Sequence, residues 1–237
     1  MSSLISVIIP TYEHAESISA CLDSVFAQTY SPIEVIVVDD GSTDNTQEVL
    51  KKYEGKIVSV KQENQGSNPA RNRGLQEAQG EFVIFVDADV IMEKEMLEKM
   101  TKTLAEHPEA SYAYSGFSFG WKTFWGTTFN AEKLKQMNFI HTTSLARRAD
   151  FPGFDNAIKR LQDWDVWLTM LEHGKKGILV PGVLFQVGIH GTSRIGSAWL
   201  PKFVYQLPWN LSPWKPVSIK KYEAARAIIA EKHKLSP

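Results

Sequence analysis

Largely apolar runs of strand length recur through the N-terminal part of the chain, and the run at residues 82–86 is apolar at every position. The runs cover residues 5–10, 33–38, 57–60 and 82–86. A run that is apolar at every position, rather than at alternate ones, is typical of a strand covered on both faces in a parallel sheet. The pattern therefore predicts a sheet that is buried between two layers.

Segments with helical periodicity separate these runs. The apolar positions of residues 18–26 fall on one face of a helix, and residues 70–79 predict another helix that Gly80 ends. Ser42 or Asp44 is suited to cap a helix between them. This alternation predicts an α/β fold with a mostly parallel central sheet flanked by helices and right-handed crossovers. Ligands of such sheets bind beyond the carboxyl ends of the strands.

The second half of the chain has a less regular pattern. Residues 111–126 are rich in aromatic residues and glycine and show no clean period. Short strands are predicted at 140–148 and 178–187, the latter broken at Pro181. Residues 162–173 form the most periodic helix of this half. The architecture after residue 110 is therefore less well determined by the pattern.

The C-terminal part of the chain is distinct in composition. Residues 199–216 alternate aromatic residues with prolines, and a final amphipathic helix is predicted over residues 219–234. The apolar face of that helix is expected to carry Tyr222, Ala225, Ile228 and Ile229. The aromatic segment fits a lid over an acceptor, an oligomer contact or a patch at a membrane interface, and the sequence does not rank these.

Composition narrows the class of protein. The 237 residues carry a formal net charge of −1, which argues against a nucleic-acid surface. Cys21 is the only cysteine, so an intramolecular disulfide is excluded and a reducing compartment is favoured. The apolar start lacks the basic flank of a signal peptide, and no run approaches the roughly 20 apolar residues of a transmembrane helix. We expect a cytoplasmic protein, with a peripheral membrane contact left open.

Two carboxylates follow the apolar run at residues 82–86. Asp87 and Asp89 are separated by one residue, so in extended backbone they point the same way. Two like charges held this close need a cation or hydrogen-bond donors between them, and Mg²⁺ or Mn²⁺ takes such oxygen ligands together with substrate phosphates. A solvated turn is the alternative. Neither a Gly-X-Gly-X-X-Gly fingerprint nor a Walker lysine loop is present, so a bound nucleotide would depend on carboxylates and a metal.

Several motifs together resemble one known family. They are Ser-Val-Ile-Ile-Pro-Thr-Tyr-Glu at 6–13, Val-Ile-Val-Val-Asp-Asp-Gly-Ser-Thr-Asp at 35–44, Asn-Gln-Gly at 64–66, Ala-Arg-Asn-Arg-Gly at 70–74, Phe-Val-Asp-Ala-Asp at 85–89 and Gln-Asp-Trp-Asp-Val-Trp-Leu at 162–168. Their order and spacing over residues 4–195 resemble the family 2 glycosyltransferases. The resemblance implies the GT-A fold, a nucleotide-sugar donor, a divalent metal ion and inversion at the anomeric carbon.

The resemblance also implies roles for individual residues. Those expected around the nucleotide are Pro10, Thr11, Tyr12, Glu13, Asp40, Gly66, Arg71, Asp87 and Ala88. Asp40 would accept a hydrogen bond from the base, and Asp87 would lie at the ribose or the metal. Asp89 would hold the metal, with His190 at the metal or the diphosphate and Arg194 beside the diphosphate. Asp163 would be the general base at a helix start, where the helix dipole favours its charged form.

Each of these roles has a plainer alternative. Asp163 could be a first-turn acid of its helix, and His190 a loop histidine with ordinary partners. Arg73 suits a surface ion pair as well as a phosphate contact. A larger group is expected to be structural or to carry no role: Asp39, Asp165, Trp164, Trp167, His14, His107, His141 and His173.

We expect a single GT-A domain over residues 1–237 that transfers a sugar, most simply from a UDP-sugar, to a hydroxyl of a saccharide or lipid-linked acceptor. Residues 1–110 would bind the nucleotide-sugar and residues 111–198 the acceptor. Gln162 departs from the family, which usually has Glu there. The rival functions are a sugar-1-phosphate nucleotidyltransferase, which should carry a Gly-rich basic loop after the first strand, and a non-catalytic binding module. The sequence does not determine the sugar, the acceptor or the oligomeric state.

Overall fold

A computed structural model describes residues 2–188 and 217–235 of the chain. Its strands are β1 (Ile5–Thr11), β2 (Ile33–Asp39), β3 (Val58–Lys61), β4 (Phe82–Phe85), β5 (Val90–Met92), β6 (Tyr112–Phe119), β7 (Lys122–Phe124), β8 (Leu145–Arg147) and β9 (Gly177–Val187). Its helices are α1 (Ile18–Phe26), α2 (Thr46–Lys51), α3 (Ser67–Glu77), α4 (Met96–Glu106), α5 (Ala131–Gln136), the short 3₁₀ helix η1 (Arg148–Asp150), α6 (Gln162–Glu172) and α8 (Val217–Lys232).

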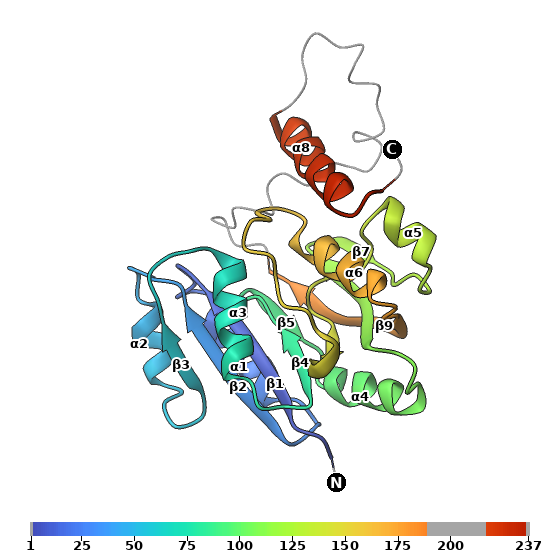
Figure 1. The fold of residues 1–237 in the computed structure, drawn as a ribbon. Helices are drawn as coiled ribbons and strands as arrows, with labels where there is room; N and C mark the ends of the chain where they lie inside the picture. The colour runs from blue at the N-terminus through green and yellow to red at the C-terminus, as the bar shows by residue number, and fades with distance from the viewer. Residues whose placement is uncertain (1, 189–216, 236–237) are drawn as a thin grey trace.

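The strands form one sheet in the order β3-β2-β1-β4-β8-β6-β9-β5, with β7 paired to β6 (Figure 1). The N-terminal strands β3, β2, β1 and β4 are parallel, as the sequence predicts. Strand β8 is antiparallel to both of its neighbours, and β5 is antiparallel to β9, whereas β6 and β9 are parallel. The expected α/β architecture is confirmed, and its second half is mixed.

Two apolar clusters cover the two faces of this sheet. One contains side chains of α1 and α4, and the other contains side chains of α3, α6 and α8. Helix α3 lies close to β1, because a Cβ atom on Gly74 would be 2.4 Å from the Ile8 Cγ2 atom. This close approach places the N-terminal end of α3 beside the carboxyl ends of the strands.

Three boundaries in the N-terminal half differ from the prediction. Strand β1 continues through Pro10 to Thr11, because its pairing with β4 ends at Ile8 and only β2 lies beside Pro10. Helix α3 begins at Ser67 rather than residue 70, since its proline falls in the first turn, where no helical N–H is needed. It ends at Glu77, so Gly80 does not cap it.

The prediction omitted several elements between residues 90 and 136, namely β5, α4, β6, β7 and α5. Residues 112–116 of β6 are buried on both faces, so they show no alternation. The C-terminal helix also differs in detail, because it buries Ile219, Ala225 and Ile229, whereas Ile228 is 56% exposed. Among the described residues, no helix is long and apolar enough to cross a membrane.

Candidate active site

The carboxyl ends of β1, β2 and β4 meet at one edge of the sheet. The Asp40 N–H donates to the Thr11 carbonyl at 2.9 Å, and the Val86 N–H donates to the Ile8 carbonyl at 2.9 Å. Both β2 and β4 are parallel to β1, so all three strands end at the same rim. The structure thus brings Thr11, Asp40 and Asp87 together, as the sequence predicts.

Glu13 joins the loop after β1 to the loop after β2. Its backbone is left-handed, with φ of 58°, which is costly for a residue other than glycine. Its N–H donates to Ser42 Oγ at 3.0 Å, and its carboxylate Oε1 accepts from the Thr43 N–H at 2.7 Å. Pro10 is buried beneath this loop, and Tyr12 is half-buried in it. The loop is therefore held in one shape before any ligand binds.

Asp40 is buried at the centre of the rim, with 3% of its surface exposed. Oδ1 accepts from Gln62 Nε2 at 2.7 Å and from the Gln65 N–H at 2.9 Å, and Oδ2 accepts from the Gly66 N–H at 2.8 Å. A carboxylate has about four acceptor positions, so one position on Oδ2 is left for a ligand. Asp40 also fixes the turn at Gly66, which has a φ of 99° and precedes α3.

Arg71 and Asp87 form an ion pair between α3 and the end of β4. The Arg71 Nη2 atom lies 2.7 Å from the Asp87 Oδ1 atom, and the Arg71 side chain is 8% exposed. Burial acts to raise the pKa of Asp87, but the charge and hydrogen bond of Arg71, together with the charges of His141 and His14, lower it overall. Asp87 is therefore ionised at neutral pH, and its Oδ2 atom is outside this pair.

Buried polar atoms without hydrogen-bond partners gather near this rim. Within the described residues they include Thr11 Oγ1 and Arg71 Nε, together with Thr143 Oγ1 just before β8. Each such atom costs about 1–3 kcal/mol if it stays unpaired. Thr11 and Arg71 are among the residues expected at the nucleotide, so their free donors fit a polar ligand there.

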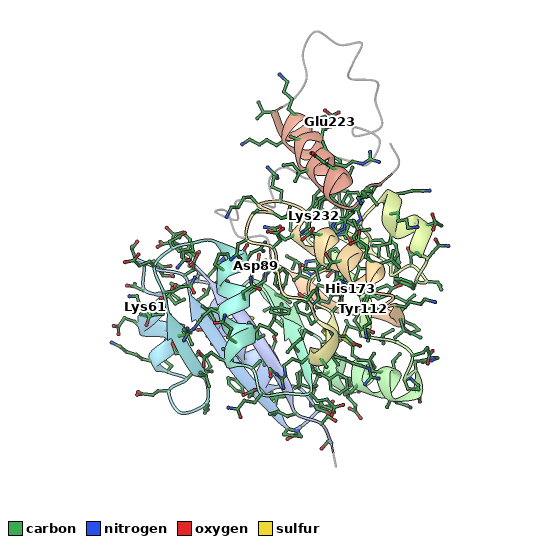
Figure 2. The ribbon with its side chains drawn as sticks, viewed as in Figure 1. Lys61, Asp89, Tyr112, His173, Glu223 and Lys232 are labelled. Atoms are coloured by element: carbon green, nitrogen blue, oxygen red, sulfur yellow. The ribbon has the colours of Figure 1, made fainter. Side chains whose placement is uncertain are left out.

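The acidic turn after β4 carries the candidate metal ligands. Ala88 is buried, whereas Asp87 and Asp89 are half-buried, and the Asp89 carbonyl accepts from the Gly188 N–H at 2.8 Å. Figure 2 places Asp89 between α3 and α6 in its view of the molecule. No group of three or more His, Cys, Asp or Glu side chains suited to a metal occurs in residues 2–188 and 217–235. The donors here fit a hard cation shared with substrate phosphates rather than an all-protein cage.

Cys21 lies under the same turn but does not suit a metal. Its thiol donates to the Asp87 carbonyl at 3.6 Å. Burial raises the pKa of the Cys21 thiol, and the charges of Asp89 and Asp87 raise it further. Because the thiolate is the form that binds metals, Cys21 acts here as a small packed residue.

Asp163 lies in the first turn of α6, where its Oδ1 accepts from the Trp164 N–H at 2.9 Å. Burial raises the pKa of Asp163 above its usual value, against the effect expected from the helix dipole. Four residues lower the pKa of Asp163 but do not cancel the rise due to burial, namely His141, Trp164, Asn138 and Arg71. A raised pKa makes this carboxylate a stronger base than an ordinary aspartate.

Asp163 and Asp87 share their surroundings. His141 and Arg71 both interact electrostatically with each of the two carboxylates, and the Asn138 side chain forms a hydrogen bond with Asp163. Sequence reasoning assigned no role to His141 or Asn138, because none of the family motifs covers them. The only available signal was their position, since His141 falls in the strand predicted at 140–148 and Asn138 lies just before it.

The structure assigns ordinary contacts to most of the residues expected to be structural. Both tryptophans of α6 are buried, and their indole N–H groups donate to the Leu134 and Ile140 carbonyls at 2.6 and 3.0 Å. Asp39 accepts from the Ser42 N–H at 2.9 Å, as expected of a turn-forming residue. Arg73 forms an ion pair with Glu77 on the same helix at 2.7 Å.

Three residues of the family pattern remain, namely His190, Arg194 and Gln162. His190 and Arg194 lie outside the described residues. Gln162, the departure from the family pattern, donates from Nε2 to the Lys159 carbonyl at 3.1 Å. Its side chain therefore bonds to the loop before α6.

Asp165 is structural, and its partners are on α8. Its carboxylate accepts from His233 Nε2 at 2.8 Å and lies 2.8 Å from Lys232 Nζ. The other ring nitrogen of His233 lies 2.8 Å from Glu172 Oε1. Since carboxylates only accept, both nitrogens of His233 carry protons and the ring is charged. Figure 2 shows Lys232 where α8 meets α6.

Replacing His233 by asparagine is expected to lower the free energy of unfolding by about 1.5–3 kcal/mol near pH 6, the range for hydrogen bonds to charged groups. Burial acts to lower the pKa of His233, but its bonds to Asp165 and Glu172 raise it overall. The stabilisation is therefore fully present below the unfolded-state pKa and is lost as pH rises through the folded-state pKa. Urea unfolding near pH 6 and pH 9 measures this, with the exposed His173→Asn as control. An equal loss at both pH values would argue against a charged His233.

A family model covers most of the chain. Residues 6–160 match the model described as glycosyl transferase family 2. Glycosyltransferase GlyA of Streptococcus pneumoniae serotype 4 is 41% identical over 106 residues, which are 44% of this chain and 15% of that protein. The putative teichuronic acid biosynthesis glycosyltransferase TuaG of Bacillus subtilis is 38% identical over 120 residues, 48% of this chain and 47% of TuaG. The matched part of the chain spans less than half the length of these two relatives.

Solved structures share the fold over a larger part of the chain. TarS 1-349 of S. aureus in complex with UDP has a TM-score of 0.69 at 24% identity and covers 78% of this chain and 60% of that one. The mannosyltransferase PcManGT of Pyrobaculum calidifontis, in complex with GDP-Man and Mn²⁺, has a TM-score of 0.66 at 21% identity, with coverages of 97% and 70%. The expected GT-A fold is confirmed. At these identities the likeness concerns the fold alone.

Proposed function

The chain belongs to family 2 of the glycosyltransferases, and on that premise we propose that it transfers a sugar from a UDP-sugar to a hydroxyl of a saccharide or lipid-linked acceptor, with inversion at the anomeric carbon. The complexes of similar fold with UDP and with GDP-Man support a nucleotide-sugar donor. The relative TuaG supports a saccharide acceptor. The observation that carries the proposal is that Asp163, a half-buried carboxylate with a raised pKa, shares His141 and Arg71 with the acidic turn.

In this proposal the nucleoside binds at the rim formed by β1, β2 and α3. The rigid loop of Pro10, Thr11, Tyr12 and Glu13 forms one wall. The remaining acceptor position on Asp40 Oδ2 takes the N–H of the base, and the Gly66 turn leaves room beside it. The unpaired Arg71 Nε and Thr11 Oγ1 gain partners from the nucleotide. The polar atoms that lack partners are thereby satisfied by the ligand.

The acidic turn would hold Mn²⁺ or Mg²⁺ against the diphosphate. The family resemblance makes Asp89 the main ligand, and Asp87, which is paired with Arg71, keeps its second oxygen for the metal or the ribose. Ala88 brings the backbone of the turn close to the nucleotide. His190 and Arg194 are assigned to the metal and the diphosphate by resemblance alone. A bound divalent cation supplies positive charge that stabilises the departing diphosphate.

Asp163 would accept the proton of the attacking hydroxyl. Inversion by a single displacement requires a base on the acceptor side and no acid at a metal-stabilised leaving group. Asn138 and the Trp164 N–H hold the Asp163 carboxylate in place, and its raised pKa increases its basicity. The protein thus separates the charge-stabilising carboxylates from the basic one.

A thermal-shift screen of nucleotide-sugars with and without Mn²⁺ tests the proposal. A UDP-sugar is expected to raise the melting temperature, and to raise it further with Mn²⁺, because ligand at about 100 times its Kd adds about 2.7 kcal/mol to stability. The donor found in this way is then assayed for transfer with saccharide and lipid-linked acceptors. Absence of stabilisation by every nucleotide-sugar would contradict the proposal.

A further inference from the structure

The segment before β8 runs between the acidic turn and the base. Strand β8 pairs antiparallel with β4, with Ile84 opposite Leu145 and Phe82 opposite Arg147. Because the two strands are antiparallel, the segment before β8 leaves the sheet at the carboxyl end of β4, where the acidic turn begins. Three residues before His141, Asn138 bonds to Asp163. His141 itself interacts electrostatically with both Asp87 of the acidic turn and Asp163.

The imidazole of His141 is held in a defined orientation. Its Nδ1 accepts from the Thr143 N–H at 3.0 Å, and its carbonyl accepts from Ser144 Oγ at 2.7 Å. The ring lies against Phe117 and Phe185, with centroid distances of 4.9 and 5.0 Å. Because Nδ1 accepts, the proton of the neutral ring is on Nε2.

The Nε2–H group of His141 has no hydrogen-bond partner among residues 2–188 and 217–235. The two bonds to Thr143 and Ser144 involve the other ring nitrogen and the backbone. Nor is Nε2 one of the buried polar atoms that lack a partner, so it faces accessible space. Burial lowers the pKa of His141 in spite of the charges of Asp87 and Asp163, which keeps the ring a neutral donor. A neutral N–H suits a hydroxyl or carbonyl oxygen.

We propose that His141 is a sugar-contacting residue, whose Nε2–H donates to an oxygen of the transferred sugar. This inference rests on the proposed function. With the diphosphate at the acidic turn and the acceptor hydroxyl at Asp163, the transferred sugar must lie between them. His141 borders this space between the acidic turn and Asp163. The contact would contribute to the choice of sugar rather than to the choice of nucleotide.

Two substitutions separate hydrogen bonding from packing. His141→Phe keeps a flat ring against Phe117 and Phe185 but removes the donor, whereas His141→Gln loses the ring and restores an N–H at a similar reach. The exposed His173, which directly follows the C-terminal end of α6 and is labelled in Figure 2, provides the matched control His173→Gln. Titration calorimetry with Mn²⁺ compares UDP with the nucleotide-sugar that wild type binds most tightly among UDP-glucose, UDP-N-acetylglucosamine and GDP-mannose.

His141→Phe is expected to bind the nucleotide-sugar about tenfold more weakly than wild type, as loss of one hydrogen bond implies, while its affinity for the free nucleotide changes less than about twofold. His141→Gln should recover part of the loss. Wild-type affinity in His141→Phe, or an equal loss for the nucleotide and the nucleotide-sugar, would overturn the inference. Failure of the proposed function looks different, because wild type itself would then bind and transfer no sugar.

Discussion

Replacing Asp163 by asparagine is expected to lower turnover by about 10²–10⁴-fold, the usual contribution of a general base. The affinity for UDP should stay within about twofold, because the proposed role of Asp163 is toward the acceptor and its hydrogen bonds are to the Trp164 N–H and the Asn138 side chain. Steady-state kinetics and titration calorimetry measure the two effects. Asp23→Asn, at an exposed carboxylate on α1, is the control. Near wild-type turnover in the Asp163→Asn variant would remove this residue from the mechanism.

The same substitution is expected to raise the stability of the fold, although it lowers turnover. The pKa of Asp163 is raised in the folded state, so its ionisation at neutral pH opposes folding. The neutral Asp163→Asn variant should therefore melt at a higher temperature than wild type at pH 7. The difference should shrink as pH falls through the raised folded-state pKa and should be gone below the unfolded-state pKa. Thermal melts over this pH range measure it. Greater stability with lost turnover is the signature of a strained functional residue.

Replacing Asp89 by alanine is expected to abolish the Mn²⁺-dependent part of nucleotide binding. The reason is that Asp87 is committed to Arg71, so no second carboxylate of the turn is free to take over fully. Calorimetric titration with UDP, with and without Mn²⁺, measures the difference. Wild type should bind more tightly with the metal, and the variant should bind equally in both conditions.

The control for Asp89 is a nearby carboxylate outside the turn. Glu93→Gln, an exposed position just after β5, should leave the Mn²⁺ dependence unchanged. An Asp89 variant that retains wild-type Mn²⁺ dependence would count against the acidic turn as the metal site.

The parallel half of the fold and its polar rim were predictable because the sequence of each strand reflects its burial in the sheet. Strands β1, β2 and β4 are buried over most of their length, so their sequences are largely apolar, and each strand is followed at the rim by polar residues. A role for Asp163 could be proposed because the family motif around it is local. The same holds for Asp40, Asp87 and Asp89.

Long-range contacts account for what the sequence did not show. Residues 112–119 become a strand because β8 and β9 pair with them on either side, and no alternation marks such a strand. His141 joins the site because antiparallel pairing of β8 with β4 brings the segment before β8 to the carboxyl end of β4. The partner of Asp165 is His233, which directly follows α8 and lies 68 residues away in the chain. None of these pairings leaves a signal within a short window of sequence. Helix α4 is different, since its apolar spacing was present in the chain and was not recognised.

The central claim is that acidic side chains at the rim hold a cation on the diphosphate while a separate carboxylate takes the acceptor proton. The most direct measurement is the anomalous scattering of Mn²⁺ in crystals of Asp163→Asn grown with an intact nucleotide-sugar, in which slow turnover preserves the donor. The account predicts a manganese peak within coordination distance of Asp89 and the diphosphate, with the anomeric carbon facing position 163. A peak bound elsewhere, or a sugar that points away from position 163, would contradict it.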